Sequence, residues 1–230
     1  MNKTLKIILE ILLLIGIVGL VYAIYSSIMK PVNFNKQKER REAVAIQRLK
    51  DIRTLQVAYK GVNGTFTSTV DSLKNFYENG KMAVVMQIGS ADDSIAWAHT
   101  EKVKKANRKI TPEQLYKMYQ DGDKNLVFSI VTQIPVKDTL FTNRPDFCAD
   151  SLAFIPFSGG EATQMEAVTR MVSGVPVPLF EARMPYKLLL KGLDNQLRIN
   201  LDAERRDQNK YEGLQVGSVT APNNNAGNWE

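Results

Sequence analysis

The sequence has very little of the chemistry on which many catalytic and metal sites depend. Among its 230 residues there is one cysteine, Cys148, and one histidine, His99. A single cysteine excludes an internal disulfide framework and any site built from several thiolates. A single histidine excludes sites that need two or more, such as the H-E-x-x-H zinc motif. We therefore expect neither a cofactor nor a catalytic metal.

Motifs for nucleophilic and phosphate chemistry are also missing. Gly159-Gly160 is followed by Glu161 rather than by the lysine of a Walker A loop. His99, the only histidine base available to a serine or cysteine nucleophile, lies in a charged stretch. Asp121-Gly122-Asp123 is a fragment of a calcium loop without the rest of an EF-hand, and predicts a turn. A membrane-anchored enzyme is therefore only the third interpretation.

A long apolar run near the N-terminus is the most informative segment. From Ile7 to Met29 it carries a single charge, Glu10. A helix of this length spans roughly 35 Å, enough for a hydrocarbon core of about 30 Å. A cleaved signal peptide has a shorter apolar region that ends in a small-x-small site, a pattern that Tyr22-Ala23-Ile24-Tyr25 lacks. We therefore expect a retained single-pass transmembrane helix within residues 1–29.

The net charge of +6 is concentrated just beyond this run. Residues 36–60 carry eight basic and three acidic side chains, whereas residues 61–230 carry 19 basic and 20 acidic ones. Basic residues beside a membrane attract anionic headgroups, although they can also simply solvate a helix face. The basic residues nearest the apolar run are candidate lipid contacts: Lys36, Lys38, Arg40 and Arg41. No nucleic-acid recognition motif accompanies them, so we expect membrane lipid rather than nucleic acid as a partner.

Residues 30–64 have the pattern of a helical stalk. Apolar residues recur at steps of three and four, which places them on one face of a helix. This stripe consists of Ala45, Leu49, Ile52, Leu55, Tyr59 and Val62. Pro31 predicts either a kink or a short break, and Asn63-Gly64 predicts the end of the helix. A free stripe could form a coiled coil, which would suit a bitopic scaffold or adaptor that organises partner proteins.

Residues 65–230 predict an α+β head with a mainly antiparallel sheet and short helices. Predicted helices begin at Ser68 and Thr111, with residues 89–109 as an exposed loop between them. The predicted strands cover Lys81–Ile88, Leu126–Ile134, Ser151–Phe157, Thr163–Val172 and Val177–Met184. Pro176 and Pro178 favour an edge position for the last of these strands.

The C-terminal part of the head is less regular in sequence. Residues 186–202 favour a helix followed by a strand, because Leu197, Ile199 and Leu201 alternate with polar residues. Residues 221–230 are polar and rich in turn-forming residues. They predict either an unstructured tail or a tail held by Trp229.

The apolar run resembles the N-terminal helix of type IV pilins and type II secretion pseudopilins. In that family a glutamate is followed by a run of the kind I-E-L-L-V-V-I-A-I-I-G-I-L-A-A-I-A. Here the corresponding residues read Leu9-Glu10-Ile11-Leu12-Leu13, and Gly19, Ala23 and Ile24 match without a gap. The stalk end, from Leu55 to Tyr59 and on to Asn63-Gly64-Thr65-Phe66, is also similar to the family's pattern. The position of the family's cleavage glycine is occupied by Leu5.

The resemblance implies a structural subunit of an envelope secretion or filament assembly. It implies that Glu10 pairs with the N-terminal amine of a neighbouring subunit, and that Gly16 and Gly19 belong to the packing surface within the membrane. We therefore expect a homo- or hetero-oligomer formed through the N-terminal helix. A positive-inside count favours a cytoplasmic C-terminal part, but large domains translocate regardless of charge. Because the family places its head outside the cytoplasm, we expect an extracytoplasmic or periplasmic head.

Overall fold

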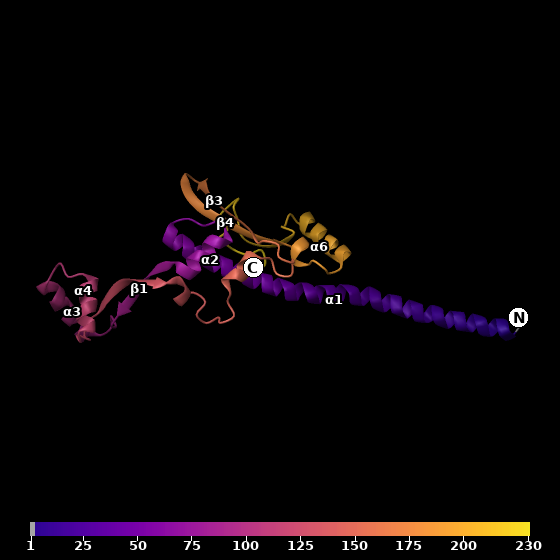
Figure 1. The fold of residues 1–230 in the computed structure, drawn as a ribbon, viewed down its shortest axis with the longest axis horizontal. Coiled ribbons are helices and arrows are strands. Elements are labelled where there is room, and N and C mark those ends of the chain that lie inside the picture. Colours follow the sequence, from indigo (N-terminus) through magenta and orange to yellow (C-terminus); the bar gives the residue numbers. More distant parts are fainter. Residues whose placement is uncertain (1–2) are drawn as a thin grey trace. The chain divides into compact units, whose positions relative to one another are not determined.

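The computed structural model describes residues 3–230 as two compact units, drawn in Figure 1. The helix–sheet unit comprises Met1–Gln56, Thr65–Val70 and Cys148–Glu230. The ribbon unit comprises Val57–Gly64 and Asp71–Phe147. Residues 65–230, which the sequence suggests as one head, are thus divided between two units.

A single long helix, α1 (Lys3–Asn63), forms the N-terminal part of the described chain (Figure 1). It is continuous through Pro31, so the alternative of a break at this residue is wrong. A proline removes one backbone hydrogen bond, and a long helix retains its other turns on both sides. The helix ends as predicted, since Gly64 has a φ of 78° and its amide donates to the Lys60 carbonyl at 2.8 Å.

The helix–sheet unit contains an antiparallel sheet in the order β3-β4-β5. Its strands are β3 (Gln164–Val172), β4 (Val175–Pro185) and β5 (Gly213–Gly217). Ser173 and Gly174 both have positive φ, which suits the tight turn that joins β3 and β4. Strands β3 and β4 match the predicted strands to within two residues, whereas β5 was not predicted.

The two prolines of β4 lie in a part of the strand that has a neighbouring strand on one side only. Pro176 and Pro178 pair only with β3, opposite Met171 and Thr169. Strand β5 pairs with β4 only from Glu181 to Pro185. The strand as a whole is therefore central rather than at an edge. Its proline-bearing end nevertheless has one unpaired side, as the missing N–H groups require.

The core of this unit combines the middle of α1 with the sheet. The stripe residues of α1 up to Leu55 are fully buried: Ala45, Leu49, Ile52 and Leu55. Strands β4 and β5 contribute side chains of similar burial: Phe180, Ala182, Met184, Leu214 and Val216. Phe66 packs against Phe180 with ring centroids 4.8 Å apart. The stripe is therefore part of the unit's own hydrophobic core.

The ribbon unit is built on a two-stranded antiparallel ribbon of β1 (Lys81–Ile88) and β2 (Phe128–Pro135). Helix α2 (Val70–Asn79) precedes β1, while α3 (Ser94–Ala106) and α4 (Pro112–Gln120) connect the strands. A short 3-10 turn, Val136–Asp138, follows β2. The helices α3 and α4 cover a small core at the Ile88–Phe128 end of the ribbon, formed by Leu115, Leu126, Phe128 and Ile130. Strand β1 and the capping box of α4 at Thr111 confirm the sequence predictions.

Three predicted segments are wrong. Residues 89–109 contain α3, because the Asp93 carboxylate accepts hydrogen bonds from the amides of Ile95 and Ala96 and caps a helix. Residues 151–157 contain the end of a 3-10 helix (Ala149–Ala153) and a single bridge between Phe154 and Ala162, in place of a strand.

The third wrong segment follows β4. A short helix α5 (Tyr186–Leu189) leads to a second helix, α6 (Asn195–Asp207), where a strand was predicted. Asp194 caps α6 by accepting from the amides of Gln196 and Leu197. The helix continues through Asp207, so it extends beyond the alternating residues into a charged stretch.

The C-terminal tail is ordered beside β5. Gly227 forms a bridge with Val216, and the Asn228 amide group donates to the Gly213 carbonyl at 2.9 Å. The Gln215 backbone amide in turn donates to the Asn228 side chain at 3.1 Å. The prediction of an unstructured tail is therefore wrong. Trp229 is half-buried, and Asn228 and Glu230 make most of the polar contacts that hold the tail.

Candidate functional site

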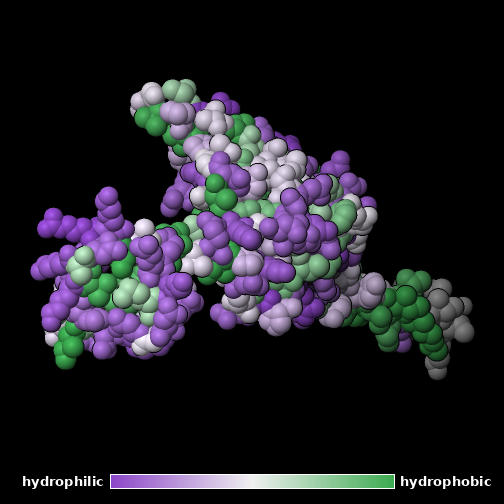
Figure 2. All heavy atoms as spheres, turned by 60° about the vertical axis from the view of Figure 1, so that its left-hand side comes forward, coloured by the Kyte–Doolittle hydropathy of each residue, from purple (hydrophilic) through white to green (hydrophobic). Residues whose placement is uncertain are grey.

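The N-terminal part of α1 exposes an unusual amount of apolar surface. In the most apolar window of the helix no residue is buried, and side chains such as Leu12 and Val21 are more than 60% exposed. Figure 2 shows this end of α1 as a mostly hydrophobic surface. Such a surface exceeds the apolar patches of ordinary soluble monomers. Among the described residues, α1 is the one helix with the length and composition to cross a membrane.

The predicted assembly residues lie on this segment. Glu10 is exposed, and no atom lies within 4 Å of a Cβ placed on Gly16 or Gly19. The described chain therefore leaves open space at both glycines. A second helix could approach closely there, because glycine has no side chain to hold it away.

Arg41 binds the rest of the helix–sheet unit. Its guanidinium donates to the carbonyl of Leu189, the last residue of α5, at 3.0 Å and to that of Lys191 at 2.8 Å. The same group lies 4.9 Å from the centroid of the Phe157 ring. Of the other candidate lipid contacts, Lys36 and Arg40 are exposed, and Lys38 lies 4.0 Å from Glu42. Two of the four predicted lipid-contact residues, Lys38 and Arg41, are thus engaged within the chain.

Glu42, the residue after Arg41 on α1, contacts the buried hydroxyl of Tyr186 in α5. Tyr186 donates a hydrogen bond to Glu42 at 2.5 Å and accepts one from Arg205 of α6 at 3.0 Å. Burial, followed by the hydrogen bond to the Glu42 carboxylate, raises the pKa of Tyr186, while Arg205 opposes the shift. Ionisation would place a second negative charge beside Glu42. The hydroxyl therefore remains a donor well above neutral pH.

Two further arginines attach α1 to its unit. Arg48 donates to the Phe154 carbonyl at 2.7 Å, and Arg53 lies 2.6 Å from Glu230. The hydrogen bond from Arg53 lowers the pKa of Glu230. Gln56, fully buried, donates to the Thr67 carbonyl at 2.6 Å and accepts from the Thr67 amide at 3.1 Å. The basic character of residues 36–60 therefore serves internal contacts to a large extent.

The apolar stripe of α1 is shared between the two units. Leu49, Ile52 and Leu55 are buried in the helix–sheet unit, whereas Tyr59 is half-buried in the ribbon unit. There the Tyr59 ring meets Phe76 of α2 edge-on, with centroids 5.3 Å apart. Val62 is 48% exposed, so the buried stripe does not extend to it.

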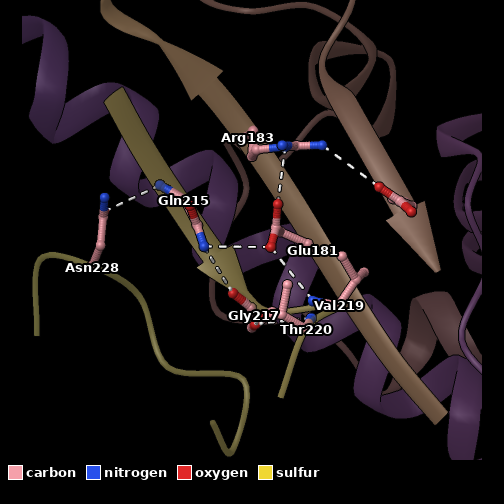
Figure 3. A network of polar contacts seen from close by, with 9 residues as sticks. Glu181, Arg183, Gln215, Gly217, Val219, Thr220 and Asn228 are labelled. Atoms are coloured by element: carbon pink, nitrogen blue, oxygen red, sulfur yellow. Dashed lines mark hydrogen bonds and ion pairs between the residues drawn. The ribbon is translucent and has the colours of Figure 1, made fainter. Parts of the chain in front are cut away.

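A network around Glu181 was not foreseen from the sequence (Figure 3). This buried carboxylate on β4 accepts from Arg183 at 3.0 Å, while its other oxygen faces Gln215 and the Val219 amide, both at 3.4 Å. Arg183 also lies 3.6 Å from Glu166 on β3. The network links β3, β4, β5 and the segment after β5, so we assign it a structural role.

An open cavity of about 670 Å³ lies beside α6. Its charged lining residues are Lys187, Arg198, Asp202, Arg206, Lys210 and Glu212. Asp202 pairs with Arg198, and Arg206 pairs with Glu212 at 2.8 Å. Burial raises the pKa of Asp202, although Arg198 opposes the shift. The two arginines are thus paired, whereas the other carboxylate oxygen of Asp202, Oδ1, is buried without a hydrogen-bond partner in the described chain. The lining does not form a catalytic arrangement with a nucleophile and a base.

The remaining chemically notable residues are dispersed. His99 lies 2.8 Å from Asp123 in the ribbon unit, and Cys148 is a free, exposed thiol in the helix–sheet unit. Within the described residues no group of three or more histidine, cysteine or acidic side chains could hold a metal ion. The apolar segment of α1 and its attachment to the unit therefore form the candidate site.

Comparisons with family models, with curated proteins and with solved structures find no match to this chain.

Proposed function

We propose that the chain is a single-pass membrane-anchored structural subunit, pilin-like or pseudopilin-like, of an envelope secretion or filament assembly. The apolar segment of α1 lies in the lipid and packs against other helices. The remaining part of the chain lies on the extracytoplasmic side. The observation that carries this proposal is the exposed apolar surface of α1, on the same helix whose next turns are buried in a folded unit.

Within the helix–sheet unit, the two halves of α1 differ in exposure as a membrane anchor joined to a folded head requires. Between Ile11 and Ile28 the large apolar side chains are exposed, whereas Phe34 and the stripe from Ala45 to Leu55 are buried. Apolar surface costs about 25 cal/mol per Å² in water, so the first half requires lipid or protein around it. The contacts of Arg41 and Glu42 fix the second half to the rest of the unit. A rigid connection between anchor and head suits a subunit whose packing is set within the membrane.

Glu10 is the polar group through which this assembly is specified. A carboxylate in the apolar segment is costly in hydrocarbon and is retained where it gains a partner. The N-terminal amine of a neighbouring chain is the partner that the pilin resemblance implies. Gly16 and Gly19, with open space around them, allow that chain to approach.

The scaffold alternative has less support. A coiled coil would need a free apolar stripe on α1, and the stripe from Ala45 to Leu55 is already buried within the chain. On α1 this leaves the N-terminal segment as the apolar surface available for association.

Disulfide crosslinking in native membranes tests the assembly. In a Cys148→Ser background, Leu20→Cys lies on the helix face of Gly16, whereas Val18→Cys lies on the opposite face. We expect dimers from Leu20→Cys and few from Val18→Cys. Adding Glu10→Ala should reduce crosslinking severalfold, while Glu39→Ala, an exposed carboxylate outside the segment, should not. Crosslinking that is unchanged by Glu10→Ala would contradict the role of Glu10.

Thiol labelling tests the orientation. Cys148 is exposed, so a membrane-impermeant maleimide should label it in intact cells or spheroplasts if the head is extracytoplasmic. Asn224→Cys in a Cys148→Ser background provides a second exposed position on the same unit. Labelling of both thiols only after lysis would place the head in the cytoplasm and contradict this part of the proposal.

A further inference from the structure

The outward face of α3 exposes side chains that do not belong to the core of the ribbon unit. The inward face of this helix is fixed by Ala96 and Thr100, both buried, and the Thr100 hydroxyl accepts from the Val127 amide at 2.8 Å. The opposite face begins with Ile95, whose side chain is 77% exposed. Ala98, Lys102 and Lys105 follow at steps of three and four and are also exposed. The face therefore runs from an aliphatic end to a basic end.

Trp97 borders this face on the side away from Ile95, about 160° from it around the helix, and is 48% exposed. The Lys104 ammonium lies 5.8 Å from the centroid of its ring and 3.6 Å from Glu101. The small core at this end of the ribbon unit is complete without Ile95 and Trp97, since it is formed by residues of α4 and β2 and the segment between them. Most of Ile95 and about half of Trp97 thus remain in solvent.

A cluster of free cations accompanies these apolar groups. Lys102, Lys105, Arg108 and Lys109 are exposed, and no ion pair engages them in the described part of the chain. Glu101 is the only acidic residue between positions 94 and 110. Figure 2, in which this end of the ribbon unit comes forward, shows hydrophilic side chains projecting around isolated hydrophobic ones.

We propose that the outward face of α3 docks on an anionic lipid surface. A tryptophan is favoured at the headgroup level, and an isoleucine gains free energy by entering the acyl boundary. Lysine and arginine are attracted to anionic headgroups at the same level. A soluble polyanion would satisfy the cations and leave Ile95 in water, so the combination favours a lipid surface. This proposal concerns the ribbon unit and does not depend on the assembly of α1.

Fluorescence of a single tryptophan tests the docking. The chain has two tryptophans, and Trp229→Phe leaves Trp97 as the reporter. The Trp229 ring nitrogen is buried without a hydrogen-bond partner, so this substitution removes no such bond. The full chain is held in phosphatidylcholine nanodiscs, and mixed phosphatidylcholine–phosphatidylglycerol vesicles are added. We expect a blue shift of Trp97 emission and co-sedimentation with the vesicles, both reduced by salt and both absent with pure phosphatidylcholine vesicles.

Matched variants separate specific from general effects of charge. Lys102→Gln, Lys105→Gln and Lys109→Gln together should weaken vesicle binding by about a hundredfold. Lys81→Gln, Lys117→Gln and Lys137→Gln remove the same charge from exposed positions elsewhere in the ribbon unit and should have a much smaller effect. Ile95→Ser should weaken binding by about tenfold or more.

Three outcomes would overturn the proposal. The first is the absence of binding to anionic vesicles. The second is an equal loss of binding in the two lysine triples, which would indicate only net charge. The third is binding that is weakened by the first lysine triple but unchanged by Ile95→Ser and by Trp97→Ser. This result would indicate that the face binds a soluble polyanion. Brominated lipid placed in the anionic vesicles should quench Trp97, whereas brominated phosphatidylcholine placed in the nanodisc should not.

Discussion

The Tyr186 hydroxyl donates a hydrogen bond of 2.5 Å to Glu42, joining residues 144 positions apart in the sequence. Tyr186 begins α5 and is fully buried, whereas Glu42 belongs to α1 just before the buried stripe. Arg205 of α6 donates to the same hydroxyl at 3.0 Å. One phenol thus connects α1, α5 and α6 at the point where α1 enters its folded unit.

Replacing the phenol tests its contribution to stability. Tyr186→Phe keeps the ring but leaves Glu42 and Arg205 without their shared partner. We expect the free energy of unfolding to fall by about 1–3 kcal/mol, because a hydrogen bond to a charged group is lost in a buried place. Chemical denaturation in detergent, followed by circular dichroism, measures the change. Tyr211→Phe is the control, since no partner of its hydroxyl is found in the described chain, and an equal loss there would contradict the role of the Glu42 contact.

The same tyrosine predicts an alkaline limit of stability. Burial and Glu42 raise the pKa of Tyr186 above its ordinary value of 10.0, so the folded state holds the proton more tightly than the unfolded state. Its contribution is therefore fully present below pH 10 and is lost as the pH rises towards the folded value. Burial also raises the pKa of Tyr211, to about 12, which acts in the same direction.

Denaturation at a series of pH values on both sides of pH 10 measures this dependence. We expect the free energy of unfolding to fall with rising pH in this range, and to fall less steeply in Tyr186→Phe. The remaining slope should be reduced further by Tyr211→Phe. A slope that is identical in the wild type and in Tyr186→Phe would show that the phenol is not protected from ionisation.

Arg41 provides a test of whether the basic residues of α1 act within the chain or on lipid. Its guanidinium binds two carbonyls at the end of α5 and just after it, whereas the neighbouring Arg40 is exposed. Arg41→Gln should therefore lower the free energy of unfolding by about 1–3 kcal/mol, while Arg40→Gln should change it by less than about 0.5 kcal/mol. Thermal unfolding in neutral detergent measures both. Equal and small effects would indicate that Arg41 is free to contact lipid.

Much of the fold follows from local sequence signals. Strand β1 has the predicted boundaries, and the end of α1 at Asn63-Gly64 and the capping box at Thr111 are found as expected. Each of these signals is short-range: apolar density, a glycine with positive φ, or a side chain that caps the backbone three residues away. The stripe of α1 was also visible in the sequence, because burial on one face of a helix imposes a period of three to four residues.

The errors arise where the buried face is small or where tertiary contacts decide. Helix α3 packs through Ala96 and Thr100, so its lysine-rich sequence has too little apolar periodicity to predict a helix. In α6 the alternation of Leu197, Ile199 and Leu201 imitates a strand, and the cap at Asp194 decides the outcome. The arginine contacts of α1 join residues more than 100 positions apart, which no local pattern specifies.

A glycine on β5 provides the last prediction. Gly217 has a φ of 74°, and a Cβ at this position would collide with the backbone carbonyl oxygen of Phe180 on β4. Gly174, in the β3–β4 turn, has a similar φ of 82° but has open space around it. Gly174→Ala should therefore cost only the strain of a left-handed backbone, about 1–2 kcal/mol.

Gly217→Ala adds a collision between two backbones that cannot rotate away, so it should lower the free energy of unfolding by several kcal/mol. Because Gly217 pairs with Glu181, the displaced strand should also disturb the Glu181 network and the tail that bridges β5. Hydrogen exchange of the amides of Gly217 and Asn228, which bond to the Ala226 and Gln215 carbonyls, measures this loss locally. If both alanine variants were equally stable, backbone conformation alone would explain Gly217, and the close approach to Phe180 would carry no energetic cost.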